Sequence, residues 1–172
     1  QGLNKFYIEF EAKETKSKNS IQIIYNIQGP LYNGQKNSTC KIELDISLRE
    51  KIILKTEIKK IGLNIEEIPL FDVTVMNEKE ILAEKVRALI TRNKARDLYD
   101  LYYLMEKETP IDITLINKKL EFYSISFSQN KLKKALETKK AIWESELRNL
   151  VKNYPPFKDV KRKIQESFKE KK

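Results

Sequence analysis

The amino-acid sequence predicts an α+β fold in which strands come first and helices follow. Apolar residues recur with a period of two in several short segments up to residue 76, which indicates strands. From Asn77 onward they recur at the helical spacing of about 3.6 residues, and strand patterns do not return. Strands followed by helices, without regular alternation, are typical of an α+β arrangement. We therefore expect two parts, residues 1–76 and residues 77–172.

The strands of the first part are bounded by polar or glycine-containing segments. Strands are predicted at Phe6–Phe10, Ile21–Ile27, Lys41–Leu48 and Leu70–Met76. The polar stretch Lys13–Ser20 is expected to form a turn, and Asn33-Gly34 is expected in a loop. In the third strand apolar and polar residues alternate, so Glu43 and Asp45 lie on the face opposite the apolar side chains.

The helices of the second part are marked by capping residues and prolines. Asn77 and Glu80 form an N-cap and capping-box pattern, which predicts a helix from there to Arg92. Further helices are predicted at Ala95–Lys107, Thr114–Phe122, Gln129–Lys152 and Phe157–Phe168. Pro110 ends the second helix, because proline disrupts a helix interior.

Length and cysteine content fit an intracellular protein. A chain of 172 residues can bury a core without disulfides, and its single cysteine, Cys40, cannot form a disulfide within the chain. There is no secretory signal and no apolar run long enough to span a bilayer. We expect a cytoplasmic protein with no membrane partner.

Histidine is absent from the sequence. This excludes histidine-based general base catalysis, Ser-His-Asp triads and nearly all zinc sites. With one cysteine and no histidine, any metal must be bound by oxygen ligands, which favours Mg²⁺, Mn²⁺ or Ca²⁺.

The net charge of +9 comes almost entirely from the second part of the chain. Residues 1–76 carry 11 Lys/Arg and 10 Asp/Glu, whereas the remaining residues carry 23 and 15. A basic excess of this kind would attract a polyanion such as RNA. No arginine cluster or aromatic platform accompanies the lysines, which favours an ordinary solvated helical surface; both interpretations stay open.

Glu43 and Asp45 are the first candidate site residues. Two carboxylates side by side on a strand repel each other, and a divalent cation near them relieves that repulsion. The alternative is a solvent-facing strand surface, where one or two acidic residues are common. The pattern alone favours this alternative.

Charged residues on two neighbouring helices form the second candidate site. Lys85 lies within the apolar stripe of the first helix, and Arg92 lies two turns further on the same side. Asp97 faces the packed side of the next helix, with Asp100 at the edge of that side. Such charges are costly unless they are paired or line a cavity. They form either structural ion pairs, Lys85 with Asp97 or Arg92 with Asp100, or a polar cleft where Lys85 contacts a phosphate.

The segment Ile81–Leu104 contains E-K-x-x-A-L-x-x-R followed, after a short gap, by R-D-x-Y-D-L-Y-x-L. This pattern resembles the signature of the AbiEii/AbiGii-type nucleotidyltransferases, a family that includes toxins of prokaryotic toxin–antitoxin and phage-defence systems. Lys41–Ser47 is similar to the family strand that carries its third acidic residue, which matches Asp45. Downstream, Trp143 and Pro155-Pro156 resemble the region of the family's last helices.

The resemblance implies part of a nucleotidyltransferase-like mixed sheet followed by a helical bundle. It also implies Mg²⁺- or Mn²⁺-dependent transfer of a nucleoside monophosphate from NTP to an acceptor such as tRNA, opposed by a cognate antitoxin. By position, Asp45 would be a metal-side acid with Glu43 beside it, and Lys85 would contact the triphosphate. Asp97 or Asp100 would be a catalytic-site acid, in the same open cleft as Asp45. Arg92 and Arg96 would bind phosphate of the nucleotide or of RNA.

One part of the family pattern has no match. The family has a Gly-Gly-Ser/Thr turn followed by an Asp-x-Asp-type pair that supplies the main metal ligands, and neither is present. We expect them upstream of Gln1, which would make the chain an inactive carboxyl-terminal portion; a degenerate homologue is the alternative. A different class of function, a non-catalytic basic module that binds RNA or a protein, also fits the charge distribution.

Overall fold

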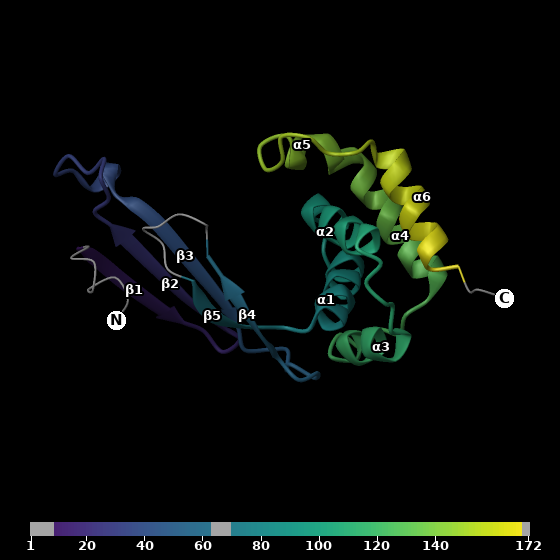
Figure 1. Cartoon of the computed structure of the whole chain (residues 1–172). Helices are drawn as coiled ribbons and strands as arrows, with labels where there is room; N and C mark the ends of the chain where they lie inside the picture. The colour runs from purple at the N-terminus through teal and green to yellow at the C-terminus, as the bar shows by residue number, and fades with distance from the viewer. Residues whose placement is uncertain (1–8, 63–69, 170–172) are drawn as a thin grey trace. The chain divides into compact units, whose positions relative to one another are not determined.

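The computed structural model describes residues 9–62 and 70–169 and confirms the predicted α+β class, with strands preceding helices along the chain (Figure 1). The chain divides into two compact units, Gln1–Lys51 and Ile52–Lys172. The change from strands to helices comes after Val75, close to the predicted position.

The first unit contains a three-stranded antiparallel sheet. Its strands are β1 (Phe10–Lys16), β2 (Ser20–Ile27) and β3 (Cys40–Ser47), in the order β1-β2-β3. The connection between β2 and β3 contains Gly34, whose φ of +90° favours glycine, and a short 3-10 helix, η2 (Lys36–Ser38). In the β2–β3 register Asp45 lies opposite Gln22, and Glu43 lies opposite Ile24.

The predicted end of the first strand was wrong. Residues 6–8 of the predicted strand lie outside the described residues, and β1 continues to Lys16, into the segment predicted as a turn. The turn is confined to the residues between β1 and β2, where the Ser17 amide donates to the Ser20 carbonyl at 2.9 Å. β1 pairs with β2 through backbone hydrogen bonds, and its side chains from Glu11 to Lys16 are exposed. An exposed edge strand needs no apolar alternation, so the periodicity gave no signal.

The second unit begins with a two-stranded antiparallel hairpin of β4 (Glu57–Ile61) and β5 (Phe71–Val75). The second strand was predicted, but β4 was missed. Its two isoleucines, Ile58 and Ile61, are three residues apart and exposed, so the segment lacks the period-two pattern of a half-buried strand.

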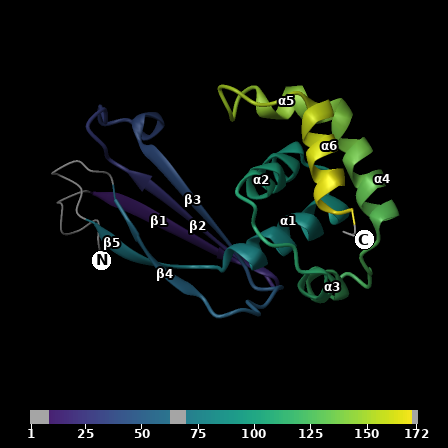
Figure 2. The ribbon, with the colours of Figure 1, turned by 45° about the vertical axis from the view of Figure 1, so that its right-hand side comes forward.

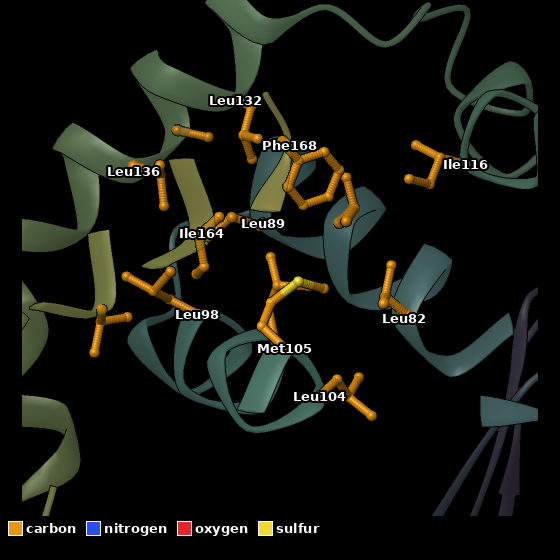
Figure 3. Close-up of a cluster of buried hydrophobic side chains, with 14 of the residues drawn as sticks. Leu82, Leu89, Leu98, Leu104, Met105, Ile116, Leu132, Leu136, Ile164 and Phe168 are labelled. Carbon is orange, nitrogen blue, oxygen red and sulfur yellow. The ribbon is translucent and has the colours of Figure 1, made fainter. Parts of the chain in front are cut away.

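The helices of the second unit surround one apolar core. They are α1 (Glu78–Thr91), α2 (Ala95–Glu106), α3 (Ile113–Glu121), α4 (Gln129–Lys139), α5 (Trp143–Leu147) and α6 (Phe157–Ser167). Figure 2 shows α1 and α2 beside each other, with α4 and α6 next to them. Leu89, Leu98, Leu136 and Ile164 come from these four helices and meet in the core (Figure 3). Their side chains are fully buried, so hydrophobic burial stabilises this arrangement.

The single helix predicted at Gln129–Lys152 is broken. α4 ends at Lys139, a 3-10 turn η3 (Lys140–Ile142) follows, and the short α5 ends at Leu147. Trp143 is buried at the break, and its indole N–H donates to the Pro155 carbonyl at 3.2 Å. The tryptophan also makes edge contacts with the rings of Tyr154 and Phe157. Helix propensity is weak compared with the burial of so large a side chain, so packing overrides it.

The start of α1 is confirmed, with one correction. The Asn77 side chain accepts from the Lys79 amide at 3.0 Å, as an N-cap does. A capping box predicts that the Glu80 side chain accepts from the Asn77 amide, but Glu80 instead makes the following contacts. Its fully buried carboxylate accepts from the amides of Ile53 and Leu54, both at 2.7 Å, and pairs with Lys119 at 2.5 Å.

Candidate functional site

The candidate site of the second unit lies at the junction of α1 and α2. Both helices direct leucines into the core, and the turn Arg92–Lys94 joins them. Lys85 lies on α1, Arg92 is its C-cap residue, and Asp97 lies in the first turn of α2. These residues and Asp100 are called the charged cluster below.

Asp97 is the centre of the charged cluster. Its side chain is fully buried, with an exposed fraction of 0%. Arg92 binds it with two parallel bonds, Nε to Oδ2 and Nη2 to Oδ1, each 2.6 Å long. Paired bonds of this kind fix orientation as well as charge. Burial acts to raise the pKa of Asp97, but the bonds from Arg92 and the charges of Lys85 and Arg96 hold that pKa below its ordinary value.

Lys85 connects the two aspartates. Its Nζ lies 2.5 Å from Asp100 Oδ2 and 3.6 Å from Asp97 Oδ1. Lys85 with Asp97 was one of the expected pairings, whereas Arg92 binds Asp97 rather than Asp100. The four charges therefore form one connected cluster instead of two separate pairs.

The charged cluster has a buried base and an accessible rim. The side chains of Lys85, Arg92 and Asp100 are 27%, 46% and 42% exposed, above the buried Asp97. Arg96, the adjacent residue on α2, is also exposed and makes no ion pair within the described residues. An anion in solvent can thus reach Lys85, Arg92 and Arg96, and the first two of these side chains pair with a carboxylate that solvent cannot reach.

The acidic face of β3 lies in the first unit. Glu43 and Asp45 are two residues apart on this strand and project from the same face, as expected. Glu43 pairs with Lys41 at 2.9 Å and accepts from Gln22 at 2.6 Å, and the Lys41 hydrogen bond lowers the pKa of Glu43. Asp45 is exposed and has no ion pair among the residues that the structure describes.

Glu43 and Asp45 offer the carboxylate oxygens that Mg²⁺ or Mn²⁺ prefers, but β3 supplies only these two carboxylates. Hard divalent cations prefer carboxylate oxygens and need several of them or water. In residues 9–62 and 70–169 no group of three or more Asp, Glu, Cys or His side chains is arranged to hold a metal. That Asp45 shares a cleft with Lys85 and Asp97 stays a prediction.

Two buried lysines were not recognised in the sequence. Lys119 and Lys139 are 3% and 2% exposed. Lys119 pairs with Glu80 and, at 2.9 Å, with Glu84. Lys139 ends the stripe Leu132, Ala135, Leu136 on α4, at a spacing that keeps all four on one face. The same spacing argument that selected Lys85 would have found both lysines.

The sequence profile of one protein family, described as "Nucleotidyl transferase AbiEii toxin, Type IV TA system", matches residues 3–170. The chain belongs to the AbiEii family. This confirms the resemblance inferred from Ile81–Leu104. Searches of curated proteins and of solved structures gave no significant match. AbiEii proteins are nucleotidyltransferase toxins of type IV toxin–antitoxin systems, which implies that NTP is their substrate. No helix among the described residues of this AbiEii chain is long and apolar enough to cross a bilayer.

Proposed function

We propose that this chain acts in the transfer of a nucleoside monophosphate from NTP to an RNA acceptor such as tRNA, with Mg²⁺ or Mn²⁺. The observation that supports the proposal most is the charged cluster, in which a buried carboxylate orients cationic side chains that solvent reaches. Phosphoryl transfer depends mainly on positioning and on neutralising phosphate charge, and such a cluster suits both tasks.

In the proposed reaction an acceptor hydroxyl oxygen attacks the α-phosphorus of NTP. A new oxygen–phosphorus bond forms, the bond to the bridging oxygen of the β-phosphate breaks, and pyrophosphate leaves. The hydroxyl proton passes to a carboxylate, for which Asp100 is the candidate because its side chain is 42% exposed. A bound divalent cation would neutralise phosphate charge, and Asp45 and Glu43 would be two of its oxygen ligands.

Asp97 has a different proposed role. A carboxylate with a lowered pKa that is held by two bonds from Arg92 is a poor proton acceptor. It is a positioning residue, which keeps Arg92 and Lys85 directed toward a phosphate. Lys85 would contact the triphosphate, and Arg92 with Arg96 would contact phosphates of the nucleotide or of RNA.

The remaining ligands and partners lie outside this chain in the proposal. Residues 1–172 contain neither the Gly-Gly-Ser/Thr turn nor the Asp-x-Asp-type pair of the family pattern, so we expect them by themselves to be inactive. The type IV toxin description of the family supports a cognate antitoxin that opposes the activity. A role in phage defence is the biological setting that we propose.

The test is nucleotide transfer by the complete protein. It is incubated with labelled NTPs, Mg²⁺ and total cellular RNA, beside Asp45→Asn and the matched control Asp72→Asn on exposed β5. We expect label in RNA with the parent and the control, and at least a hundredfold less with Asp45→Asn, about the loss seen when one charge-stabilising group is removed. No transfer by a folded complete protein with any NTP or divalent metal would refute the proposal.

A non-catalytic RNA-binding module is the second candidate function, favoured by the basic excess after residue 76. It predicts RNA affinity that falls steeply with salt and that survives Asp45→Asn. Binding that does not respond to salt would exclude it.

A further inference from the structure

A cavity of about 630 Å³ in the second unit is lined by the end of α1 and by one side of α4. It lies next to the charged cluster, because Arg92 belongs to both. Its floor is apolar, with Leu89, Ile90, Ile125 and Ala135. Four cationic side chains line it, namely Arg92, Lys131, Lys134 and Lys139. No acidic side chain does so among the described residues.

Two of these lysines, Lys134 and Lys139, have no carboxylate within ion-pair distance among the described residues. Lys134 is exposed and makes no hydrogen bond or ion pair with the described residues. Lys139 is 2% exposed, and its ammonium is hydrogen-bonded to the Thr138 hydroxyl at 3.0 Å with no carboxylate in ion-pair range in the described chain. Burial lowers the pKa of Lys139, and the charges of Asp97 and Glu146, which lie beyond ion-pair distance, offset that effect only in part. A phosphate in the cavity would supply a closer counter-charge.

We propose that this cavity binds the phosphate backbone of single-stranded RNA and so holds the acceptor beside the charged cluster. The assignment as acceptor site rests on the proposed nucleotidyl transfer, whereas the phosphate binding does not. Separate ammonium groups suit phosphodiesters, which carry one charge each along a chain. NTP instead binds together with a divalent cation, and the cavity offers no carboxylate to hold one.

The lining also indicates how RNA is recognised. Aromatic side chains, on which bases stack in many single-strand-binding proteins, are absent from the cavity lining among the described residues. Binding therefore depends on phosphates, is insensitive to base identity and falls with salt. Four cations correspond to a slope of about −3 in log affinity against log salt, at about −0.7 per single-strand contact.

The experiment is binding of a fluorescein-labelled oligouridine of about ten nucleotides to the full chain, measured by anisotropy over a salt series. Lys134→Gln should weaken binding about fivefold at 0.1 M salt and make the slope about 0.7 less steep. Lys139→Met should do the same without lowering the unfolding midpoint, because it removes a buried charge. The control is Lys158→Gln, an exposed lysine of α6 outside the cavity lining, which should leave affinity and slope unchanged.

Further titrations distinguish RNA from NTP and inorganic phosphate as the ligand of the cavity. They also distinguish a failure of the phosphate-binding proposal from a failure of the proposed nucleotidyl transfer. Fluorescent NTP with Mg²⁺ and inorganic phosphate are titrated against the same variants. Loss of NTP binding with unchanged oligouridine binding would overturn the RNA assignment in favour of a nucleotide site. Equal RNA binding by wild type, Lys134→Gln and Lys139→Met would overturn the cavity as a site, even if transfer by the complete protein is active. Cavity-dependent RNA binding without any transfer would leave phosphate binding standing and refute only the enzyme.

Discussion

Replacement of Lys119 by methionine tests the buried ion pair that joins α3 to α1. Lys119 and Glu80 are 3% and 0% exposed and lie 2.5 Å apart. Removing one partner of a buried pair leaves an uncompensated charge and costs about 3–5 kcal/mol. Glu80 keeps its two bonds from the amides of Ile53 and Leu54, which favours the lower end of that range. The expected loss is about 3 kcal/mol.

The measurement is urea and thermal unfolding followed by the fluorescence of Trp143, the only tryptophan of the chain and 2% exposed. For a chain of this size about 3 kcal/mol corresponds to a midpoint lower by about 6–12 °C. Lys118→Met, on the exposed side of the same helix, is the control and should stay within about 0.5 kcal/mol of wild type. A loss below about 1 kcal/mol for Lys119→Met would refute the reasoning.

The same pair predicts a dependence on pH. Burial acts to raise the pKa of Glu80, but the bonds from Lys119 and the two amides hold it below its ordinary value. A lowered folded-state pKa stabilises the protein above the unfolded pKa of about 4.3, and this stability is lost as pH falls through the folded pKa. The difference in unfolding free energy between wild type and Lys119→Met should therefore shrink below about pH 4. A difference that stays constant to pH 2 would contradict the assignment to Glu80.

Three further variants follow from the described contacts. Lys85→Met should leave the unfolding free energy within about 1 kcal/mol of wild type, because Asp97 keeps its bonds from Arg92. The same change in the complete protein should abolish nucleotide transfer, and retained transfer would make Lys85 purely structural. Lys139→Met should raise stability by about 1 kcal/mol near neutral pH. Burial lowers the pKa of Lys139 in the folded protein. The unfolding free energy of the wild type should therefore rise with pH between this lowered pKa and the unfolded-state pKa of about 10.4, and a pH series should show no such rise in the variant. Glu146→Ala should cost about 1 kcal/mol in urea unfolding, because Glu146 accepts from the first amide of α2 at 2.7 Å; exposed Glu144→Ala is its control, and equal effects would contradict the capping role.

The sequence predicted the helical elements better than the strands, for a physical reason. α1 combines a side-chain N-cap with a buried apolar stripe, and α2 has a buried apolar stripe, so local pattern and tertiary packing agree. β1 is exposed and β4 has only two isoleucines, and strands held by backbone pairing alone leave little trace in composition.

Of the ion pairs in the charged cluster, the sequence predicted Lys85 with Asp97 but not Arg92 with Asp97. A helical wheel shows that Lys85 and Asp97 face inward, but the turn at Arg92–Lys94 decides which charges meet across the two helices. The cavity could not be predicted, because it brings together the end of α1 and α4, elements about 40 residues apart in the chain. Its buried lysine was nevertheless marked in the sequence by its place in an apolar stripe.

The two amides bound by Glu80 determine where an independently expressed helical unit must start. They belong to Ile53 and Leu54, upstream of β4, although the carboxylate lies in the first turn of α1. A truncation at the strand-to-helix transition would remove both donors and leave a fully buried carboxylate with Lys119 as its main remaining partner. A protein product starting at Ile52 retains them, so the boundary suited to expression lies about 25 residues upstream of the first helix.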